Sequence, residues 1–148
     1  MKKPLSKIFK ELGIDFTFPI EIKNSNDKET YYESSKGYWR RREYDEQGNK
    51  TYYENHNAYW IRREYDEWGK QTYSEASDGS WVRREYDEQG NETYYENSSG
   101  YWIRREYDKH SKQTYSEDSN GNKSGTPRTS CNNKVITIDG QKYKLSKI

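Results

Sequence analysis

The sequence predicts an all-β fold in which 21-residue hairpin repeats form a single-layer antiparallel β-meander, with a small N-terminal α+β cap and a C-terminal hairpin. Three observations predict it. Trp recurs every 21 residues within the pattern W-x-R-R-E-Y-D, at positions 39, 60, 81 and 102. Each unit holds two runs rich in Tyr, Thr and Arg, which are typical of strands, separated by turn-forming residues. The Gly-bearing turns lie only about ten residues apart, which is too close for two helices per unit.

Residues 1–29 are predicted to form the cap. The apolar residues of the stretch LSKIFKEL fall on one helical face: Leu5, Ile8, Phe9 and Leu12. Gly13 stops the helix, and the next stretch, DFTFPIEI, alternates Phe and Ile with other residues as a strand does. Repeat arrays need terminal units that differ from the internal ones, and this segment fits that role.

Residues 30–118 are predicted to form the array, with nine strands and two kinds of turn. The stretch DEQGN suits a three-residue loop, Glu46–Gly48, in which the Gly takes the left-handed bulge position. The other turn, with Lys36–Gly37 at its centre in the first unit, suits a two-residue type I′ loop. With one odd loop and one even loop, an odd period keeps every Trp on the same face.

These loops define a predicted register across the sheet. One face then carries an alternating row of aromatic and basic side chains: Tyr31, Arg42, Tyr52, Arg63, Tyr73, Arg84, Tyr94, Arg105 and Tyr115. The other face carries the Trp residues beside a second row: Arg41, Tyr53, Arg62, Ser74, Arg83, Tyr95, Arg104 and Ser116. Cross-strand pairs contribute roughly 0.2–1 kcal/mol each, and an Arg over an exposed aromatic ring about 0.5–1 kcal/mol. Many such small terms are expected to hold the sheet together.

The composition argues against a second layer. Hydrophobic residues make up 28% of the 148 residues, and 16 of them are Tyr. Between residues 30 and 133, the aliphatic side chains larger than Ala are Ile61, Val82 and Ile103. Both faces of the sheet are therefore expected to contact solvent. The 16 Tyr and five Trp also distinguish the chain from disordered proteins, which are poor in aromatic residues.

The C-terminal part is predicted to be a flexible linker, residues 119–133, followed by a hairpin over residues 134–148 that turns at Asp139–Gly140. Charge is unevenly distributed along the chain. Residues 38–121 hold 13 Lys and Arg against 18 Asp and Glu, a net charge of −5, whereas residues 122–148 hold six against one, a net charge of +5. Any attraction to polyanions is therefore expected in the tail.

The chain is expected to be cytoplasmic. Its start, MKKPLSKIFKEL, is cationic but lacks the apolar run of a secretory signal, and no stretch has the length of a transmembrane helix. The lone Cys131 excludes an internal disulfide. No association with a membrane is expected.

The repeat resembles known families of short β-hairpin repeats. The pattern Y-D-x-x-G-N followed by Y-Y-E-N and G-x-W, across residues 28–121, is similar to the YD repeats of Rhs-type proteins and to MORN-2 repeats. The chain departs from both, because YD repeats usually form large shells in very long chains and MORN-2 units carry more Gly and Lys. It also looks like small phage and mobile-element proteins. The resemblance implies an interaction architecture without catalytic residues.

The chain is predicted not to be an enzyme and to need no metal or cofactor. His56 and His110 occupy non-equivalent repeat positions, and Cys131 lies in the predicted linker. The repeated carboxylates, such as Glu43 and Glu54, have the chemistry of acid–base pairs. On an open sheet, however, nothing excludes water or perturbs their pKa, and the Arg rows offer them ion-pair partners.

Binding is the expected function, and a protein partner is favoured. Trp, Tyr and Arg dominate the energetics of protein interfaces, and the array displays them on a flat, repeated surface. The candidate partner-binding residues are Trp39, Trp60, Trp81, Trp102, Arg41, Arg62, Arg83, Arg104, Tyr53 and Tyr95. Two alternatives stay open: single-stranded nucleic acid stacked on the Arg and Tyr ladders, which the net charge of −5 disfavours, and glycans stacked on the Trp row.

Two roles are expected for a protein-binding array of this kind. It can act as a phage-type inhibitor that blocks a host defence protein, or it can act as a scaffold. The open edges of the sheet also offer a route to oligomerisation, because their backbone groups have no partner strand.

Overall fold

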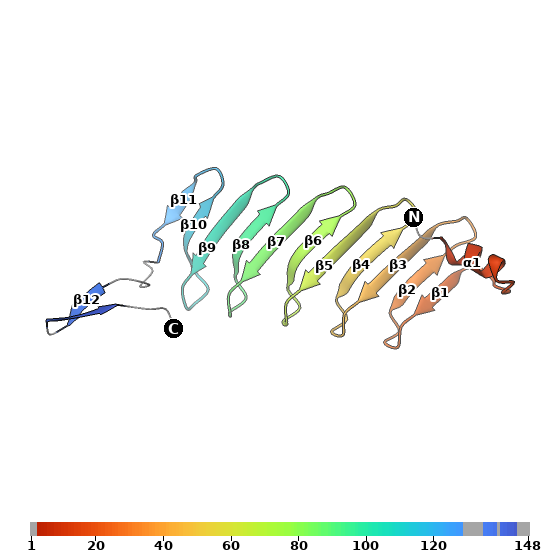
Figure 1. Ribbon diagram of the computed structural model, residues 1–148, viewed down its shortest axis with the longest axis horizontal. Helices are drawn as coiled ribbons and strands as arrows, with labels where there is room; N and C mark the ends of the chain where they lie inside the picture. The colour runs from red at the N-terminus through yellow and green to blue at the C-terminus, as the bar shows by residue number, and fades with distance from the viewer. Residues whose placement is uncertain (1–2, 129–134, 139, 145–148) are drawn as a thin grey trace.

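The computed structural model describes residues 3–128, 135–138 and 140–144. It contains one open antiparallel sheet of eleven strands in chain order, a short helix at the N-terminal end and a separate two-stranded sheet (Figure 1). The helix and strands are α1 Leu5–Glu11, β1 Ile20–Lys23, β2 Glu29–Glu33, β3 Trp39–Tyr44, β4 Lys50–Asn55, β5 Trp60–Tyr65, β6 Gln71–Ala76, β7 Trp81–Tyr86, β8 Glu92–Asn97, β9 Trp102–Tyr107, β10 Gln113–Asp118, β11 Lys123–Gly125, β12 Val135–Ile138 and β13 Gln141–Lys144. The predicted single-layer meander of hairpins, with its N-terminal cap and C-terminal hairpin, is confirmed.

The sheet has two strands more than the nine predicted. Strands β2 to β10 correspond to the predicted array, and β1 comes from the cap. Strand β11 lies within residues 119–133, the segment predicted to be a flexible linker, and pairs with β10. Cys131 of the predicted linker and Asp139 of the C-terminal hairpin lie outside the described residues, while Ile138 and Gln141 pair across the predicted turn.

Both kinds of turn in the array are three-residue loops. In the DEQGN turn, the N–H of Asp45 donates to the carbonyl of Asn49 at 3.0 Å, and the turn that begins at Ser34 closes in the same way at 2.9 Å. The two-residue loop predicted at Lys36–Gly37 is therefore wrong. A type I′ turn needs a positive φ at both central residues, which is unfavourable for Lys36. The three-residue loop needs it only at Gly37, whose φ is 80°.

Two loops with an odd number of residues would not by themselves keep every Trp on one face with a 21-residue period. A β-bulge in every unit adds the one residue that is needed. Glu43 pairs with Tyr52, whereas Tyr44 pairs with Lys50, so Thr51 has no residue opposite it. Equivalent bulges lie at Thr30, Thr72, Thr93 and Thr114. The extra residue returns the chain to the same face in the next unit, and the four Trp side chains share one face, as predicted.

The bulge also shifts each hairpin by one residue from the predicted register. Arg42 pairs with Tyr53 rather than with Tyr52. Since paired residues lie on the same face, Tyr53 and the equivalent Tyr95 lie on the face that does not carry the Trp residues. The predicted alternation of Arg42-type and Tyr52-type residues in one row is therefore wrong. We call the face with Trp39, Trp60, Trp81 and Trp102 the Trp face, and the face with Arg42, Arg63, Arg84 and Arg105 the opposite face.

Successive units are staggered along the strands. Trp60 pairs with Glu54, and Glu54 pairs on its other side with Arg41 rather than with Trp39. Each unit is thus displaced by two residues, roughly 6.6 Å, along the strand direction. The strands consequently lie oblique to the long axis of the sheet (Figure 1). The Trp side chains form a staircase rather than a straight row.

Tyrosines on the opposite face tie each hairpin to the one before it. The hydroxyl of Tyr65 donates to the carbonyl of Lys50 at 3.0 Å. Three further hydroxyls make the same bond at 3.1–3.2 Å: Tyr44 to Glu29, Tyr86 to Gln71 and Tyr107 to Glu92. The Asp that follows each Tyr shapes the loop, as at Asp66, whose carboxylate accepts the N–H groups of Trp68 and Lys70. The Y-D pair of the repeat therefore has a structural role.

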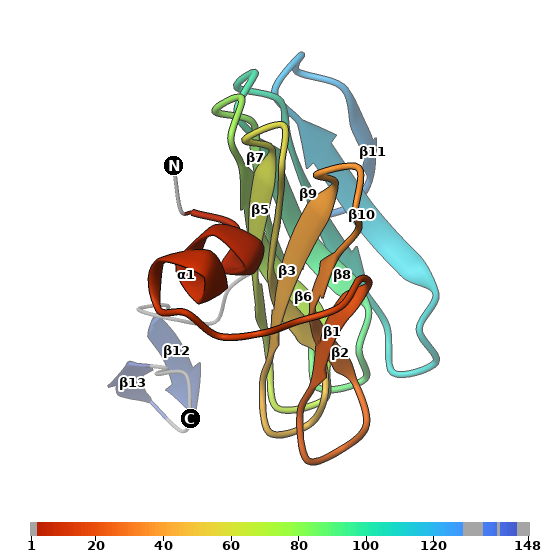
Figure 2. The same ribbon diagram turned by 90° about the vertical axis from the view of Figure 1, so that its right-hand side faces the viewer.

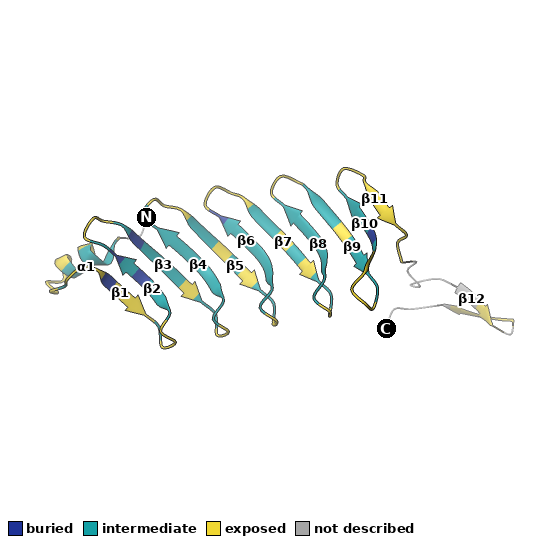
Figure 3. Ribbon diagram, turned by 180° about the vertical axis from the view of Figure 1, so that it is seen from behind, coloured by how far each residue is buried: buried dark blue, intermediate teal, exposed yellow. Residues whose placement is uncertain are grey.

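A cluster of buried apolar side chains lies at the N-terminal end of the sheet. It consists of Ile20, Tyr31 and Trp39, packed with Leu5, Phe9 and Phe16 of the cap. Helix α1 lies against one face of the sheet there (Figure 2). Along the rest of the array, most strand residues are half-buried (Figure 3), as expected for a single layer with solvent on both faces.

Replacing Tyr65 with Phe is expected to lower the free energy of unfolding by about 0.5–1.5 kcal/mol, because it removes the hydrogen bond to Lys50 and keeps the ring. Urea denaturation monitored by circular dichroism measures this change. Tyr59→Phe is the matched control, because Tyr59 is exposed and its hydroxyl has no hydrogen-bond partner among the described residues. Equal losses in the two variants would contradict the role of the Tyr65 hydroxyl.

The free energy of unfolding is expected to decrease in acid, because Asp side chains in the loops have lowered pKa values. The N–H groups of Lys112 and His110 lower the pKa of Asp108, and the side chain of Asn122 lowers the pKa of Asp118. A carboxylate whose pKa is lower in the folded chain adds stability that is fully present above its unfolded pKa, about 4, and is lost as the pH falls through its folded pKa. The urea midpoint should therefore decrease below about pH 4, and less steeply in Asp108→Asn. A midpoint that increases on acidification would exclude this explanation.

Candidate functional site

The Trp face repeats a small set of polar and aromatic side chains along the array. Strands β3, β5, β7 and β9 each contribute a Trp, an Arg two residues later and a Glu two residues after that. Strands β4, β6, β8 and β10 each contribute a Tyr and a Glu. The structure thus brings eight of the ten predicted residues onto one face: Trp39, Trp60, Trp81, Trp102, Arg41, Arg62, Arg83 and Arg104. It places the other two, Tyr53 and Tyr95, on the opposite face.

The cap removes one of the four Trp residues from the available surface. Trp39 is 6% exposed, because α1 and the cap residues pack on it. Trp60, Trp81 and Trp102 are half-buried and lie beyond the cap. Among the described residues, the part of the Trp face that lies beyond the cap therefore extends from β4 to β10, with Arg128 contacting Glu106 at β9.

Helix α1 is held by two side chains of β2 that satisfy its first backbone amides. The N–H of Leu5 donates to the hydroxyl oxygen of Tyr31 at 2.9 Å, and the N–H of Ser6 donates to Glu33 Oε2 at 3.0 Å. The hydroxyl of Ser6 also donates to Glu33. The helix lacks a side-chain cap of its own at Pro4, so the sheet provides the acceptors that the helix start needs.

Tyr31 and Glu33 work as a pair. The Tyr31 hydroxyl donates to Glu33 Oε2 at 2.7 Å while it accepts from Leu5. Burial raises the pKa of Tyr31, so the hydroxyl keeps the proton that it donates. Glu33 is only 2% exposed, and its donors are two hydroxyls and a helix amide rather than a basic side chain. The positive end of the helix compensates its charge.

The same Tyr-x-Glu pair recurs on the other even-numbered strands, but the carboxylates differ in their partners. Glu75 forms an ion pair with Arg62 at 2.8 Å, and Glu117 forms ion pairs with Arg104 at 3.2 Å and with Lys123 at 3.0 Å. Glu54 and Glu96, the equivalent residues of β4 and β8, form no ion pair within the described part of the chain. The Arg residues beside them turn instead to the next Glu of their own strands: Arg41 to Glu43 and Arg83 to Glu85, both at 2.6 Å.

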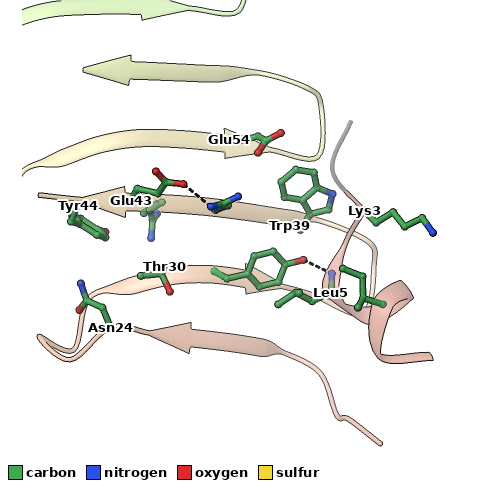
Figure 4. A pocket seen from close by; sticks show the side chains of 12 residues that line it. Lys3, Leu5, Asn24, Thr30, Trp39, Glu43, Tyr44 and Glu54 are labelled. Carbon is green, nitrogen blue, oxygen red and sulfur yellow. Dashed lines mark hydrogen bonds and ion pairs between the residues drawn. The ribbon is translucent and has the colours of Figure 1, made fainter. Parts of the chain in front are cut away.

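A pocket of about 710 Å³ separates α1 from this part of the Trp face (Figure 4). Leu5 and Ile8 line it from the helix, and Trp39, Arg41 and Glu54 line it from the sheet. Glu54 Oε2 is buried and accepts no hydrogen bond. The pocket therefore combines apolar walls with an unsatisfied carboxylate oxygen.

Several charged side chains of the opposite face form ion pairs with one another. Glu29 forms ion pairs with Arg40 and Arg42, both at 2.6 Å, and the hydrogen bond from Arg40 lowers the pKa of Glu29. Glu92 accepts from Arg105 at 2.5 Å and lies 3.4 Å from Arg84.

The two predicted Tyr residues on this face also pack internally. The guanidinium of Arg84 lies 5.4 Å from the ring centre of Tyr95, and the rings of Tyr53 and Tyr59 are 6.3 Å apart. Tyr53 and Tyr95 therefore lie on the other face of the sheet from the eight remaining candidates.

Sequence reasoning missed two features of the surface. Trp68, in the loop between β5 and β6, is 65% exposed and stands where two other units have Gln47 and Gln89. That departure from the repeat was the available signal. The Tyr31–Glu33 pair was missed because the repeat pattern does not say which face the helix covers.

No catalytic arrangement is found among the residues that the structure describes. The His56 ring packs on Tyr38, with ring centres 4.7 Å apart, and His110 is exposed in a loop. Within the same ranges, no group of three His, Cys, Asp or Glu side chains is placed to hold a metal ion. Nor does any described helix combine the length and apolar character needed to cross a bilayer.

No family model matches the chain, and no curated protein sequence is significantly similar to it. The resemblance to YD and MORN-2 repeats stays a prediction. The candidate surface is therefore defined by its geometry alone.

Replacing Glu33 with Gln is expected to loosen α1, because the amide retains one acceptor oxygen where two hydroxyls and a backbone N–H now donate. The loss of stability should be about 1–3 kcal/mol. Hydrogen exchange of the Leu5 and Ser6 amides, measured by NMR, should accelerate. Glu64→Gln, at an exposed position of the same face, is the control. Unchanged exchange in Glu33→Gln would contradict the capping role of this carboxylate.

Proposed function

We propose that the chain is a non-enzymatic protein-binding repeat module that uses the Trp face from β4 to β10. One observation carries this proposal. The Trp face binds a protein segment at its first unit, where α1 covers Trp39 and bonds to Tyr31 and Glu33. From β4 to β8 the sheet presents the same kinds of side chain, and none of the hydrogen bonds and ion pairs of the described residues ties another segment to them; at β9 the N–H of Arg128 donates to Glu106.

The chemistry of the open units supports a protein partner. Trp, Tyr and Arg are the residue types enriched in interface hot spots. The half-buried Trp60 and Trp81 alternate with the exposed Arg62 and Arg83. The partner surface would have to offer apolar groups to the Trp residues and acidic groups to the Arg residues between them. Such a surface would match the Trp face in both shape and charge.

The two other classes of ligand have less support. Nucleic acid requires phosphate neutralisation, and the array has a net charge of −5 while Arg40, Arg42 and Arg105 are engaged with Glu29 and Glu92. Glycan stacking requires an exposed ring face, and the staircase Trp residues are half-buried or buried.

A module of this kind can act by blocking its partner, as a phage-type inhibitor of a host defence protein does, or by scaffolding it. The two modes are distinguished by the activity of the purified partner when the module is added. Inhibition at equimolar concentration supports blocking, and unchanged activity in a stable complex supports scaffolding.

Capture of a partner by the immobilised chain tests the working surface. Trp60→Ala combined with Trp81→Ala should weaken binding by several kcal/mol, on the order of 2–4 per hot spot. Calorimetric titration of the purified partner measures it. Arg62→Glu with Arg83→Glu provides a second disruption at exposed positions, where loss of an ion pair costs little stability.

Tyr53→Ala, on the opposite face, is the matched control and should leave affinity unchanged. If neither pair of substitutions on the Trp face weakens binding while the variants stay folded by circular dichroism, the Trp staircase has only a structural role. The working surface would then lie elsewhere on the chain.

A further inference from the structure

We propose that Tyr52, Glu54 and Trp60 form a receptor for the first turn of an amphipathic helix from a protein partner. This inference rests on the proposed function and names the partner's chemistry at one unit. We call these three residues the second helix site, and the equivalent Tyr31, Glu33 and Trp39 the first helix site.

The first helix site shows what such a receptor binds. It holds the first two amides of α1 and a Ser hydroxyl through Tyr31 and Glu33, while apolar helix side chains pack on Trp39. The matching ligand therefore has free N–H groups, a small hydroxyl residue in its first turn and an apolar face.

The second helix site repeats this arrangement in the same register. Glu54 pairs with Trp60 across the β4–β5 ladder, as Glu33 pairs with Trp39 across the β2–β3 ladder, and Tyr52 precedes Glu54 by two residues. Burial raises the pKa of Tyr52, as it does that of Tyr31. The acceptor and aromatic groups that bind α1 are thus all present one unit further along.

The carboxylate of the second helix site has no ion-pair partner among the described residues. Arg41 forms its ion pair with Glu43, and Glu54 Oε2 is buried without a donor. Because Glu54 Oε2 is not exposed, the Glu54 side chain must change rotamer to accept from an incoming helix amide; the bond would then satisfy this oxygen, and the positive end of the helix would compensate its charge. Glu75, one unit further, is instead paired with Arg62. The sites are therefore chemically distinct although the repeat is nearly the same.

The space beside α1 has the character that the ligand requires. Leu5 and Ile8 of α1 line the pocket of about 710 Å³ together with Arg41 and Glu54 of the sheet, and the pocket also extends to Arg42 and Tyr44 of β3. A second helix start in this pocket would bury its apolar face against α1 and its amides against Glu54. The new contact would continue the interface that α1 already forms with the Trp face.

A peptide that copies residues 3–14, KPLSKIFKELGI, is the probe, since it carries the groups that the first helix site binds. Fluorescence anisotropy of the labelled peptide with the full chain should show saturable binding. Glu54→Gln and Tyr52→Phe should each weaken it, the former by about tenfold, the effect of losing a hydrogen bond to a charged group. Glu75→Gln, the control, should change affinity less than about twofold.

A second peptide with Pro in place of Ser6 lacks the donated N–H and hydroxyl, and it should not bind. Absence of saturable binding by the first peptide would overturn the inference. So would binding that depends on Glu33 but not on Glu54, because the peptide would then be exchanging with α1. Self-association of the chain that is lost in Glu54→Gln would also overturn it, since a second copy would occupy the site.

The two proposals fail separately. If Trp60→Ala with Trp81→Ala abolishes capture of the partner while the peptide binds independently of Glu54, the protein-binding function stands and the helix receptor does not. If the peptide binds through Glu54 but no variant of the Trp face affects the partner, the reverse holds.

Discussion

Beyond the cap, the inner strands of this sheet depend on their neighbours, because among the described residues the buried apolar cluster is confined to the N-terminal end. Stability is therefore carried by contacts that run from one hairpin to the next. The hydroxyl of Tyr65 bonds to the backbone of the preceding hairpin, and Asp66 closes the loop that follows. In the loops, Lys28 and Lys70 each reach the carbonyl of a Gly in the next unit, Gly48 and Gly90. Such a lattice of nearest-neighbour bonds behaves as a one-dimensional array, in which each unit is stabilised by the units beside it.

This dependence explains why the two faces differ in their availability. On the opposite face, Glu29 pairs with two Arg residues of β3, and Glu92 is shared between Arg84 of β7 and Arg105 of β9. On the Trp face the Arg residues also form ion pairs, but most of these are more exposed, and Glu54 and Glu96 form none among the described residues. The contact with α1 shows that a helix can bind to this face. The cap thus stabilises the end of the array through the same side-chain chemistry that the remaining units present to solvent.

Much of the fold followed from the sequence, because turn chemistry and the 21-residue period are local properties. The common face of the Trp residues was predicted correctly, although for a reason that the structure corrects. A bulge at Thr51 has no strong local signal, since Thr favours strands with or without a bulge. Its one-residue shift was enough to move Tyr53 and Tyr95 to the other face. The position of α1 was not predictable either, because its apolar stripe fits any aromatic surface of similar shape, and the Tyr-x-Glu pair that binds it recurs on β4, β6, β8 and β10.

Because the bulge recurs in every unit, this sheet can be lengthened by whole units of 21 residues without a change of face. Since every unit restores the same face and adds the same oblique step, duplication or loss of 21 residues would leave all other contacts in phase. Among the described residues, Glu75 and Glu117 form ion pairs, whereas Glu54 and Glu96 do not. The ion pairing of these carboxylates therefore repeats every two units. Adding one such pair of units would extend the sheet by four strand spacings, about 19 Å. The length of the sheet and the number of Trp-face units are therefore coupled in this architecture, and both are set by the number of repeats.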